Sequence, residues 1–134
     1  MDTRVVILLE DNEFSANVIR RMLEIGGYGC AEAHTEEEAL AHCRTYGERV
    51  EAMISELILP GFLGTDAAVK AEALVPGLPI LFVSSIPWVA WPHSERGKVA
   101  SLPSVGHLDK PFRARALLDA LSRLVRGKAM ASDV

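Results

Sequence analysis

The stretch that decides the fold is VVILLED, residues 5–11, near the start of the chain. Its first five residues are all apolar, and the run opens with β-branched valines. A short, uninterrupted apolar run is typical of a strand buried on both faces of a parallel sheet. Glu10 and Asp11 follow directly, so the predicted strand ends in a pair of carboxylates.

Working outward from this strand, apolar runs alternate with helical patterns. Further strands are expected at about residues 28–33, 52–55, 80–83 and 105–108. The first helix is expected to bury a stripe made of Phe14, Val18, Met22 and Ile25, with Ile19 and Leu23 beside it, and to stop at Gly26-Gly27. The second opens with a capping box at residues 35–38, and Thr65 is a candidate cap for the third. This alternation predicts an α/β fold with helices on both faces of a parallel sheet.

Length and composition fit one domain with one core, because the chain has 134 residues and 49% of them are hydrophobic. The net charge of −4 argues against a general affinity for nucleic acid. The early apolar run, Val5 to Leu9, is too short for a signal peptide core or a membrane span. Cys30 and Cys43 are too few for a disulfide scaffold, so we expect a reducing, cytoplasmic location.

Polar side chains collect where the predicted strands end. They are Glu10 and Asp11 after the first strand, Glu56 after the third, Ser84 after the fourth, and Asp109 and Lys110 after the fifth. In open parallel sheets, sites form at the carboxyl ends of the strands. Crowded carboxylates repel one another, so this group needs either a cation or raised pKa values. Mg²⁺ and the Lys110 ammonium could each supply the positive charge.

In this order and at these strand ends, the residues resemble the receiver domain of two-component response regulators. The resemblance rests on Glu10-Asp11, on ELILPG at residues 56–61 with Gly64, on Ser84-Ser85 and on Lys110-Pro111-Phe112. It covers residues 4–125 and implies a flavodoxin-like, three-layer, doubly wound sheet of five parallel strands in the order 2-1-3-4-5. The domain is expected to span residues 1–126, followed by a flexible tail over residues 127–134.

The same resemblance implies how the site is used. It implies Mg²⁺ held by Glu10, Asp11, Glu56 and the backbone carbonyl of Ile58. It also implies that Ser84 and Lys110 reach a phosphoryl group, and that the Lys110-Pro111 peptide bond is a candidate for the cis form.

The main departure from the family pattern is Glu56, which stands where the family carries the phospho-accepting aspartate. That aspartate attacks the phosphorus of a kinase phosphohistidine while Mg²⁺ neutralises charge. Glutamate has a longer arm, which moves the carboxylate by up to about 1.5 Å. A displacement of about 1 Å can slow a reaction roughly 10²-fold. We therefore expect phosphotransfer to be absent or slow, with Glu56 paired to Lys110 in partial imitation of the phosphorylated state.

Two further departures lie near the fifth strand. His107 stands where the family tends to carry an aromatic switch residue, and the segment 86–103 contains Pro87, Pro92 and Pro103. Because proline disrupts interior helix hydrogen bonds, we expect a fourth helix that is short or irregular, near residues 94–100 with Ser94 as its cap. Trp88 and Trp91 in this segment, with Arg113 and Arg115 at the last helix, are candidate partner-binding residues.

Three classes of function follow. The first is a stand-alone receiver that contacts a histidine kinase or a downstream protein, with phosphotransfer lost or impaired and Mg²⁺ bound weakly or not at all. The second is a working receiver that accepts phosphate from a histidine kinase. The third, an enzyme on the same kind of sheet, is not expected because no G-x-G-x-x-G or Walker loop follows a strand. A homodimer is a further candidate assembly, whereas membrane and nucleic acid are not expected partners.

Overall fold

The computed structural model describes the backbone of residues 4–132 and the side chains of residues 4–128. Five parallel strands form the central sheet: β1 (Val5–Leu9), β2 (Gly29–Ala33), β3 (Val50–Glu56), β6 (Ile80–Ser84) and β7 (Val105–Asp109). The helices are α1 (Glu13–Ile25), α2 (Glu36–Tyr46), α3 (Gly64–Leu74), α4 (His93–Ala100) and α5 (Ala114–Ser132). Short elements complete the chain: 3-10 turns η1 (Gly47–Arg49) and η2 (Trp88–Ala90), and the hairpin strands β4 (Ile58–Leu59) and β5 (Phe62–Leu63).

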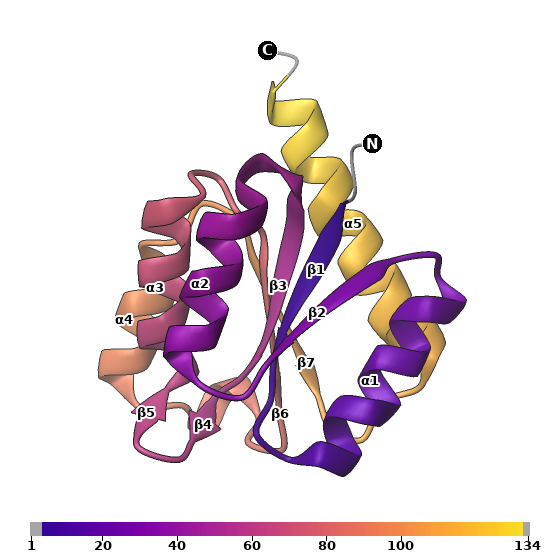
Figure 1. Cartoon of the computed structure of the whole chain (residues 1–134). Coiled ribbons are helices and arrows are strands. Elements are labelled where there is room, and N and C mark those ends of the chain that lie inside the picture. The colour runs from indigo at the N-terminus through magenta and orange to yellow at the C-terminus, as the bar shows by residue number, and fades with distance from the viewer. Residues whose placement is uncertain (1–3, 133–134) are drawn as a thin grey trace.

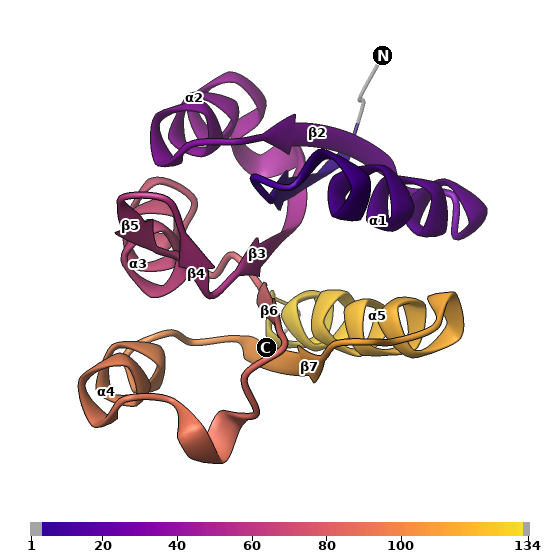
Figure 2. The ribbon, with the colours of Figure 1, turned by 90° about the horizontal axis from the view of Figure 1, so that it is seen from below.

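The strand order is β2-β1-β3-β6-β7, which is the predicted order 2-1-3-4-5 of the sheet strands. Helices α1 and α5 cover one face, and α2, α3 and α4 lie on the other (Figures 1 and 2). The flavodoxin-like, three-layer architecture is therefore confirmed. The carboxyl ends of the strands all point to one edge of the sheet, at the bottom of Figure 1.

The sheet divides the core into two layers, and β1 supplies both because each of its residues is buried. Val6 and Leu8 pack under α1 and α5, whereas Val5, Ile7 and Leu9 pack on the opposite side. Alternate residues of a strand point to opposite faces of the sheet. The uninterrupted apolar run therefore follows from burial on both faces.

Helix α1 buries Ile19 and Leu23, which were expected beside the predicted stripe, but not the two ends of the stripe itself. Ala16, Ile19 and Leu23 are buried, whereas Phe14 and Ile25 at the two ends of the helix are exposed. Several apolar residues sit on more than one face of this helix, so periodicity alone did not fix its rotation. Phe14 and Ile25 are therefore exposed apolar side chains on the surface of the domain.

Two helix starts are built differently from the expectation. Thr35 caps α2 by accepting the Glu38 N–H at 3.1 Å, but the Glu38 carboxylate accepts from the His34 N–H at 3.2 Å. Thr65 is not a cap, because α3 already begins at Gly64 and the Thr65 side chain is fully buried. The loop before α3 also contains the β4–β5 hairpin, which was not predicted.

Helices α4 and α5 differ from the expected elements in where they begin or end. Helix α4 is eight residues long, so the predicted short fourth helix is confirmed, but it begins at His93 and has no side-chain cap. Helix α5 continues past Gly127 to Ser132, so the expected flexible tail is helical over residues 127–132. Alanine, lysine and methionine after Gly127 are strong helix formers, which offsets the ~1 kcal/mol cost of the glycine. Among the described residues, no helix is long and apolar enough to cross a membrane.

Candidate functional site

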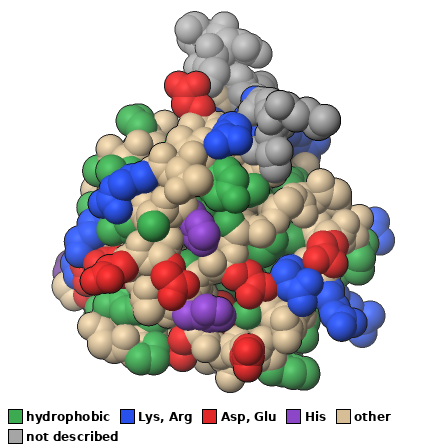
Figure 3. Space-filling model, viewed as in Figure 1, with side chains coloured by type: hydrophobic (Ala, Val, Ile, Leu, Met, Phe, Trp, Pro, Cys, Tyr) green, Lys and Arg blue, Asp and Glu red, His purple; other side chains and the backbone are tan. Residues whose placement is uncertain are grey.

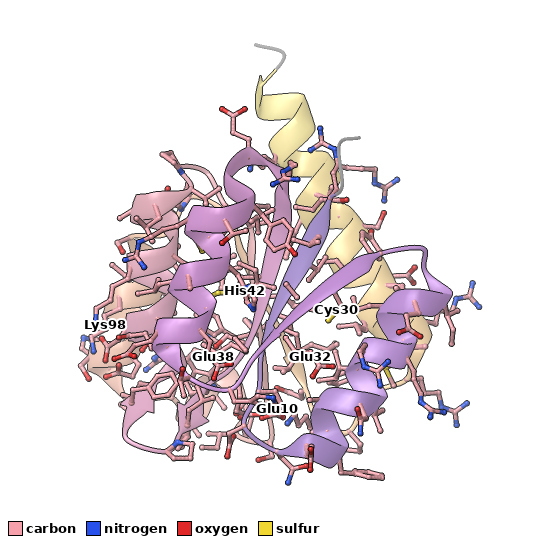
Figure 4. All side chains as sticks on the ribbon, in the orientation of Figure 1. Glu10, Cys30, Glu32, Glu38, His42 and Lys98 are labelled. Atoms are coloured by element: carbon pink, nitrogen blue, oxygen red, sulfur yellow. The ribbon has the colours of Figure 1, made fainter. Side chains whose placement is uncertain are left out.

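Three side chains meet at the carboxyl edge of the sheet. The Lys110 Nζ donates to Glu56 Oε2 at 2.6 Å and to Glu10 Oε1 at 3.0 Å. Glu10 follows β1, Glu56 ends β3 and Lys110 follows β7, so the sheet brings together residues up to 100 positions apart. Figure 4 shows Glu10 at this lower edge. The predicted gathering of these three charges is confirmed, and we call them the charged triad.

The triad is partly withdrawn from water. The exposed fraction is 3% for the Glu10 side chain, 13% for Glu56 and 25% for Lys110. Burial raises the pKa of Glu10 above its ordinary value, against the opposing effect of Lys110. Burial by itself would lower the pKa of Lys110, but the hydrogen bonds to Glu56 and Glu10 outweigh it and the net shift is upward. The ammonium is therefore held in its charged form between two carboxylates.

The position of Glu56 depends on the close approach of α3. A Cβ on Gly64 would lie 2.0 Å from the Glu56 carbonyl oxygen, so only glycine fits there. The Gly64 N–H donates to the Leu57 carbonyl at 2.7 Å, which closes the intervening loop. Leu57 is buried and anchors that loop to the core. The Gly64 seen in the sequence motif is thus required by the packing directly behind the site.

The set of oxygen ligands expected for Mg²⁺ is not assembled. Among the described residues, no group of three or more acidic, histidine or cysteine side chains is arranged to hold a metal ion. Asp11 is exposed, and the Glu10 and Glu56 carboxylates converge on the Lys110 ammonium. A lysine placed between the two carboxylates occupies the position where their charges would bind a divalent cation. The residues in this arrangement do not fit a Mg²⁺ site.

Ser84 and Pro111 flank the triad as expected from their positions in the sequence. Ser84 is buried, and its Oγ accepts the Ile86 N–H at 3.0 Å, so the hydroxyl caps the turn after β6. The Lys110 N–H donates to the Ser84 carbonyl at 2.8 Å, which joins β7 to β6 at the site. The Lys110-Pro111 peptide bond is cis, as predicted.

His107 lies on β7 under an aromatic stack. The ring of Trp88 is parallel to the His107 ring, with an interplanar angle of 7° and centroids 5.1 Å apart. The guanidinium of Arg96 lies over the Trp88 ring, 5.9 Å from its centroid. Trp88 is partly buried, while its neighbour Val89 is 80% exposed.

Trp91 is not available to a partner, which corrects its assignment as a partner-binding candidate. It is only 3% exposed and packs edge-on against Phe82, with ring centroids 5.4 Å apart. Its Nε1 donates to the Ile86 carbonyl at 2.9 Å. Tryptophan is often buried when its N–H finds an acceptor. Trp91 therefore fills the core beside β6 where a longer fourth helix would otherwise cover the sheet.

A buried polar cluster, which sequence analysis did not predict, holds α4 in place. The Glu95 carboxylate accepts from the Lys98 ammonium at 2.8 Å, from the Ser94 hydroxyl at 2.6 Å and from the Thr65 hydroxyl at 2.8 Å. These hydrogen bonds lower the pKa of Glu95 to about 2. Lys98 also pairs with Asp66 at 2.9 Å. The contacts tie α4 to α3, and only the i,i+3 spacing of Glu95 and Lys98 could have hinted at them.

A shallow apolar groove of about 220 Å³ runs between α1 and the segment after β7. It is lined by Phe14, Ser15, Val18, Ile19, Met22, Lys110, Pro111 and Phe112. The sequence assigned Phe14, Val18 and Met22 to the core stripe, so the groove was missed. Helical spacing alone could not show that Phe14, which adjoins the site, is exposed and not part of the core.

Charge on the surface is mixed. On the face shown in Figure 3, acidic side chains spread across the lower part and basic side chains lie at the flanks. Arg113 and Arg115 are both exposed at the start of α5. The cation that contacts a tryptophan ring, however, is Arg96.

Sequence comparison finds a match to the response regulator receiver domain over residues 6–122. The chain is 26% identical over 121 residues to the response regulator receiver protein CpdR of Brucella abortus, covering 90% of this chain and 95% of that protein. It is 25% identical over 117 residues to the chemotaxis protein CheY of Halobacterium salinarum, covering 87% and 92%.

Structural comparison gives the same fold. A CheY-like response regulator receiver domain from Methanospirillum hungatei superposes with a TM-score of 0.82 at 20% identity, covering 96% of this chain and 98% of that one. The match to the receiver domain extends over most of the chain and includes each residue of the charged triad. The chain is therefore a member of the response regulator receiver domain family.

Proposed function

We propose that this receiver acts in two-component signalling by protein contact, and that its acceptor position, Glu56, is not switched by phosphate. The observation that carries the proposal is the Lys110 ammonium, 2.6 Å from Glu56 and 3.0 Å from Glu10. The lysine that would contact a phosphoryl group is already neutralised by a side chain of the protein itself. Such a site is closed without any added group.

The geometry opposes nucleophilic attack by Glu56 in two ways. Its Oε2 accepts a short, charge-assisted hydrogen bond, which lowers the reactivity of that oxygen. An in-line attack also needs the phosphorus about 3–3.5 Å from the nucleophile. The longer glutamate arm places the carboxylate forward, in contact with Lys110, where a bound phosphoryl group would have to lie. We therefore infer that phosphotransfer to Glu56 is absent or very slow.

The same contact supports a partial imitation of the phosphorylated state. Lys110 is joined to β7, and its N–H bonds to the Ser84 carbonyl, so the Glu56–Lys110 pair links β3 to the β6–β7 end of the sheet. A phosphoryl group on the acceptor would form a comparable link to the lysine. We infer that Mg²⁺ binds weakly, because any divalent cation must first displace the lysine from both carboxylates.

Contact with another protein is the form of output that we propose for this domain. The segment 86–103, one of the departures from the family pattern, exposes Val89 and part of Trp88 beside β7. We propose that a histidine kinase or a downstream signalling protein is the partner, and that the chain works in the cytoplasm without enzymatic activity of its own.

A working phosphotransfer receiver is the second candidate, and one observation favours it. Lys110, Ser84 and the cis Lys110-Pro111 bond all surround Glu56, so most of the family site is present. If the Glu56–Lys110 contact opened in solution, the carboxylate would be exposed to a phosphodonor.

Amide spectra recorded by NMR separate the two candidates. We expect that acetyl phosphate with Mg²⁺ leaves the amides of Ser84, Glu56 and Lys110 unmoved in the native chain. In Glu56→Asp, which restores the shorter arm, the same amides should shift. Large shifts in the native chain that disappear in Glu56→Ala would favour the working receiver instead.

A further inference from the structure

Helix α4 has little in its own sequence to keep it ordered. Only Glu95 and Val99 of its eight residues are buried, and Gly97 lies in its interior. No side chain caps its first turn. A helix of this length is not stable by itself in water, and an interior glycine weakens it further. The order of α4 therefore depends on the contacts that hold it to the rest of the domain.

One buried carboxylate joins α4 to α3. Glu95 is 5% exposed and accepts from the Thr65 hydroxyl and from the Lys98 ammonium, each at 2.8 Å. Lys98, which Figure 4 shows on the side of the domain formed by α3 and α4, also pairs with Asp66 at 2.9 Å. Thr65 and Asp66 both belong to the first turn of α3. We call these four residues the α4 tether, because they fasten α4 to a single turn of its neighbour.

The turn that receives the tether lies directly behind the acceptor position. Helix α3 begins at Gly64, whose N–H donates to the Leu57 carbonyl at 2.7 Å. A side chain on Gly64 would collide with the Glu56 carbonyl oxygen, so the two backbones are in close contact. The next residue, Thr65, is fully buried. Closely packed interiors transmit small displacements, so a shift of the Glu56 backbone can pass through the start of α3 to the tether.

A second contact of α4 involves the aromatic rings beside β7. The Arg96 guanidinium lies over the partly buried Trp88 ring, which in turn stacks on His107. A cation over a partly exposed ring is held more weakly than a buried, charge-assisted hydrogen bond. The tether is thus the stronger of these two attachments, and it is the one that leads to the acceptor strand.

We propose that the α4 tether is a conformational link, which makes the attachment of α4 depend on the backbone position of Glu56. Helix α4 stays ordered while Gly64 is seated against Glu56, and it detaches as a unit when that contact loosens. The sheet remains folded, because segments with few buried apolar contacts open at a lower free energy than the core. This inference goes beyond the proposed function and does not depend on whether Glu56 accepts phosphate.

Hydrogen exchange of the full chain, followed by NMR, tests whether the tether holds α4. Thr65→Val keeps the shape of the side chain but removes the hydroxyl that donates to Glu95. The amides of residues 97–100 should then exchange about tenfold faster or more, because a hydrogen bond to a buried charge is lost. The amides of Ile54 and Phe82, in the central strands, should keep their native exchange rates.

Two further variants check that the effect belongs to the tether. Lys98→Met removes the cation from the more exposed side of the tether and should also accelerate exchange in α4. It becomes the decisive variant if the buried Thr65→Val substitution prevents folding. Lys70→Met is the matched control, because Lys70 also lies on α3 but pairs with Glu36 on α2. This control should leave exchange in α4 unchanged.

A double-mutant cycle tests whether the tether carries the link to Glu56. Glu56→Ala removes the 2.6 Å contact with Lys110 that holds the end of β3, so we expect the α4 amides to exchange roughly fivefold faster. In the Thr65→Val background, the same substitution should have no further effect. In the Arg96→Gln background, which separates α4 from Trp88 and leaves the tether intact, the effect should remain. No phosphodonor is added, so phosphorylation of Glu56 would refute the proposed function without changing this result.

Any one of the following results would overturn the proposal. Unchanged exchange in α4 in both Thr65→Val and Lys98→Met would show that the tether does not hold the helix. Equal acceleration in α4 and in the central strands would indicate global unfolding instead of detachment. An absent effect of Glu56→Ala, or the same effect with and without Thr65→Val, would remove the link to the acceptor position. An effect that is lost in Arg96→Gln but kept in Thr65→Val would place the link in the aromatic stack.

Discussion

The carboxyl edge of the sheet and the flank beside β7 differ in how far their side chains are satisfied by contacts within the chain. At the edge, each charge of the triad has a partner within 3.0 Å, so the site is complete by itself. At the flank, the short α4 leaves aromatic rings to cover the sheet, with Trp91 buried and Trp88 only half covered. The contrast teaches that one region satisfies its charges with the chain's own side chains, whereas the other leaves apolar and aromatic side chains partly exposed.

Replacing each of the two tryptophans by alanine should lower the free energy of unfolding by very different amounts. Trp91→Ala removes a buried ring packed on Phe82 and leaves the Ile86 carbonyl without its donor. We expect a loss of about 3–5 kcal/mol in the free energy of unfolding. Trp88→Ala removes a half-exposed ring and should lose only about 1 kcal/mol. Urea unfolding followed by circular dichroism measures both, and equal losses would contradict the assigned roles.

Removing the Lys110 ammonium should destabilise the charged triad at the carboxyl edge of the sheet. In Lys110→Met, the Glu10 and Glu56 carboxylates face each other without compensation, so we expect a loss of about 1–3 kcal/mol at neutral pH. Mg²⁺ should bind the variant more tightly than the native chain, because no lysine competes for the two carboxylates. Calorimetric titration measures this, and unchanged Mg²⁺ affinity would count against the triad as the reason for weak binding. Lys70→Met, which removes an exposed pair with Glu36, is the control and should change stability by less than about 1 kcal/mol.

Acid should loosen α4 more than the triad. The pKa of Glu95 is lowered from the ordinary 4.5 to about 2 by its hydrogen bonds to Lys98, Ser94 and Thr65. A lowered pKa in the folded state means that the stabilisation is present above about pH 4.5 and is lost as the pH falls toward 2. The stability difference between the native chain and Glu95→Gln should therefore shrink across this interval. A difference that stays constant down to pH 2.5 would show that the carboxylate is not held ionised by the cluster.

Much of the fold could be predicted because its signals are local. The all-apolar β1 run, the capping residue Thr35 and the strand-end positions of Glu10, Glu56 and Lys110 each point to the observed structure. A parallel sheet brings all strand ends to one edge, so the gathering of Glu10, Glu56 and Lys110 could be predicted from the sequence.

The remaining features depend on tertiary contacts that no local pattern encodes. The rotation of α1, which exposes Phe14, is set by its packing against the sheet. Thr65 resembles a helix cap in the sequence, but its hydroxyl is used by Glu95 thirty residues later. Trp88 and Trp91 are alike in the sequence, and it is the packing on Phe82 and the hydrogen bond to the Ile86 carbonyl that accompany the burial of Trp91.

Intact-mass analysis after incubation with acetyl phosphate and Mg²⁺ tests the closed site most directly. We expect the native chain to show no stable gain of one phosphoryl group. Glu56→Asp should show the gain, because it withdraws the carboxylate from Lys110 and restores room for the phosphorus, and Glu56→Ala serves as the control without an acceptor. A stable gain in the native chain that is lost in Glu56→Ala would contradict the proposal that Glu56 holds this receiver closed.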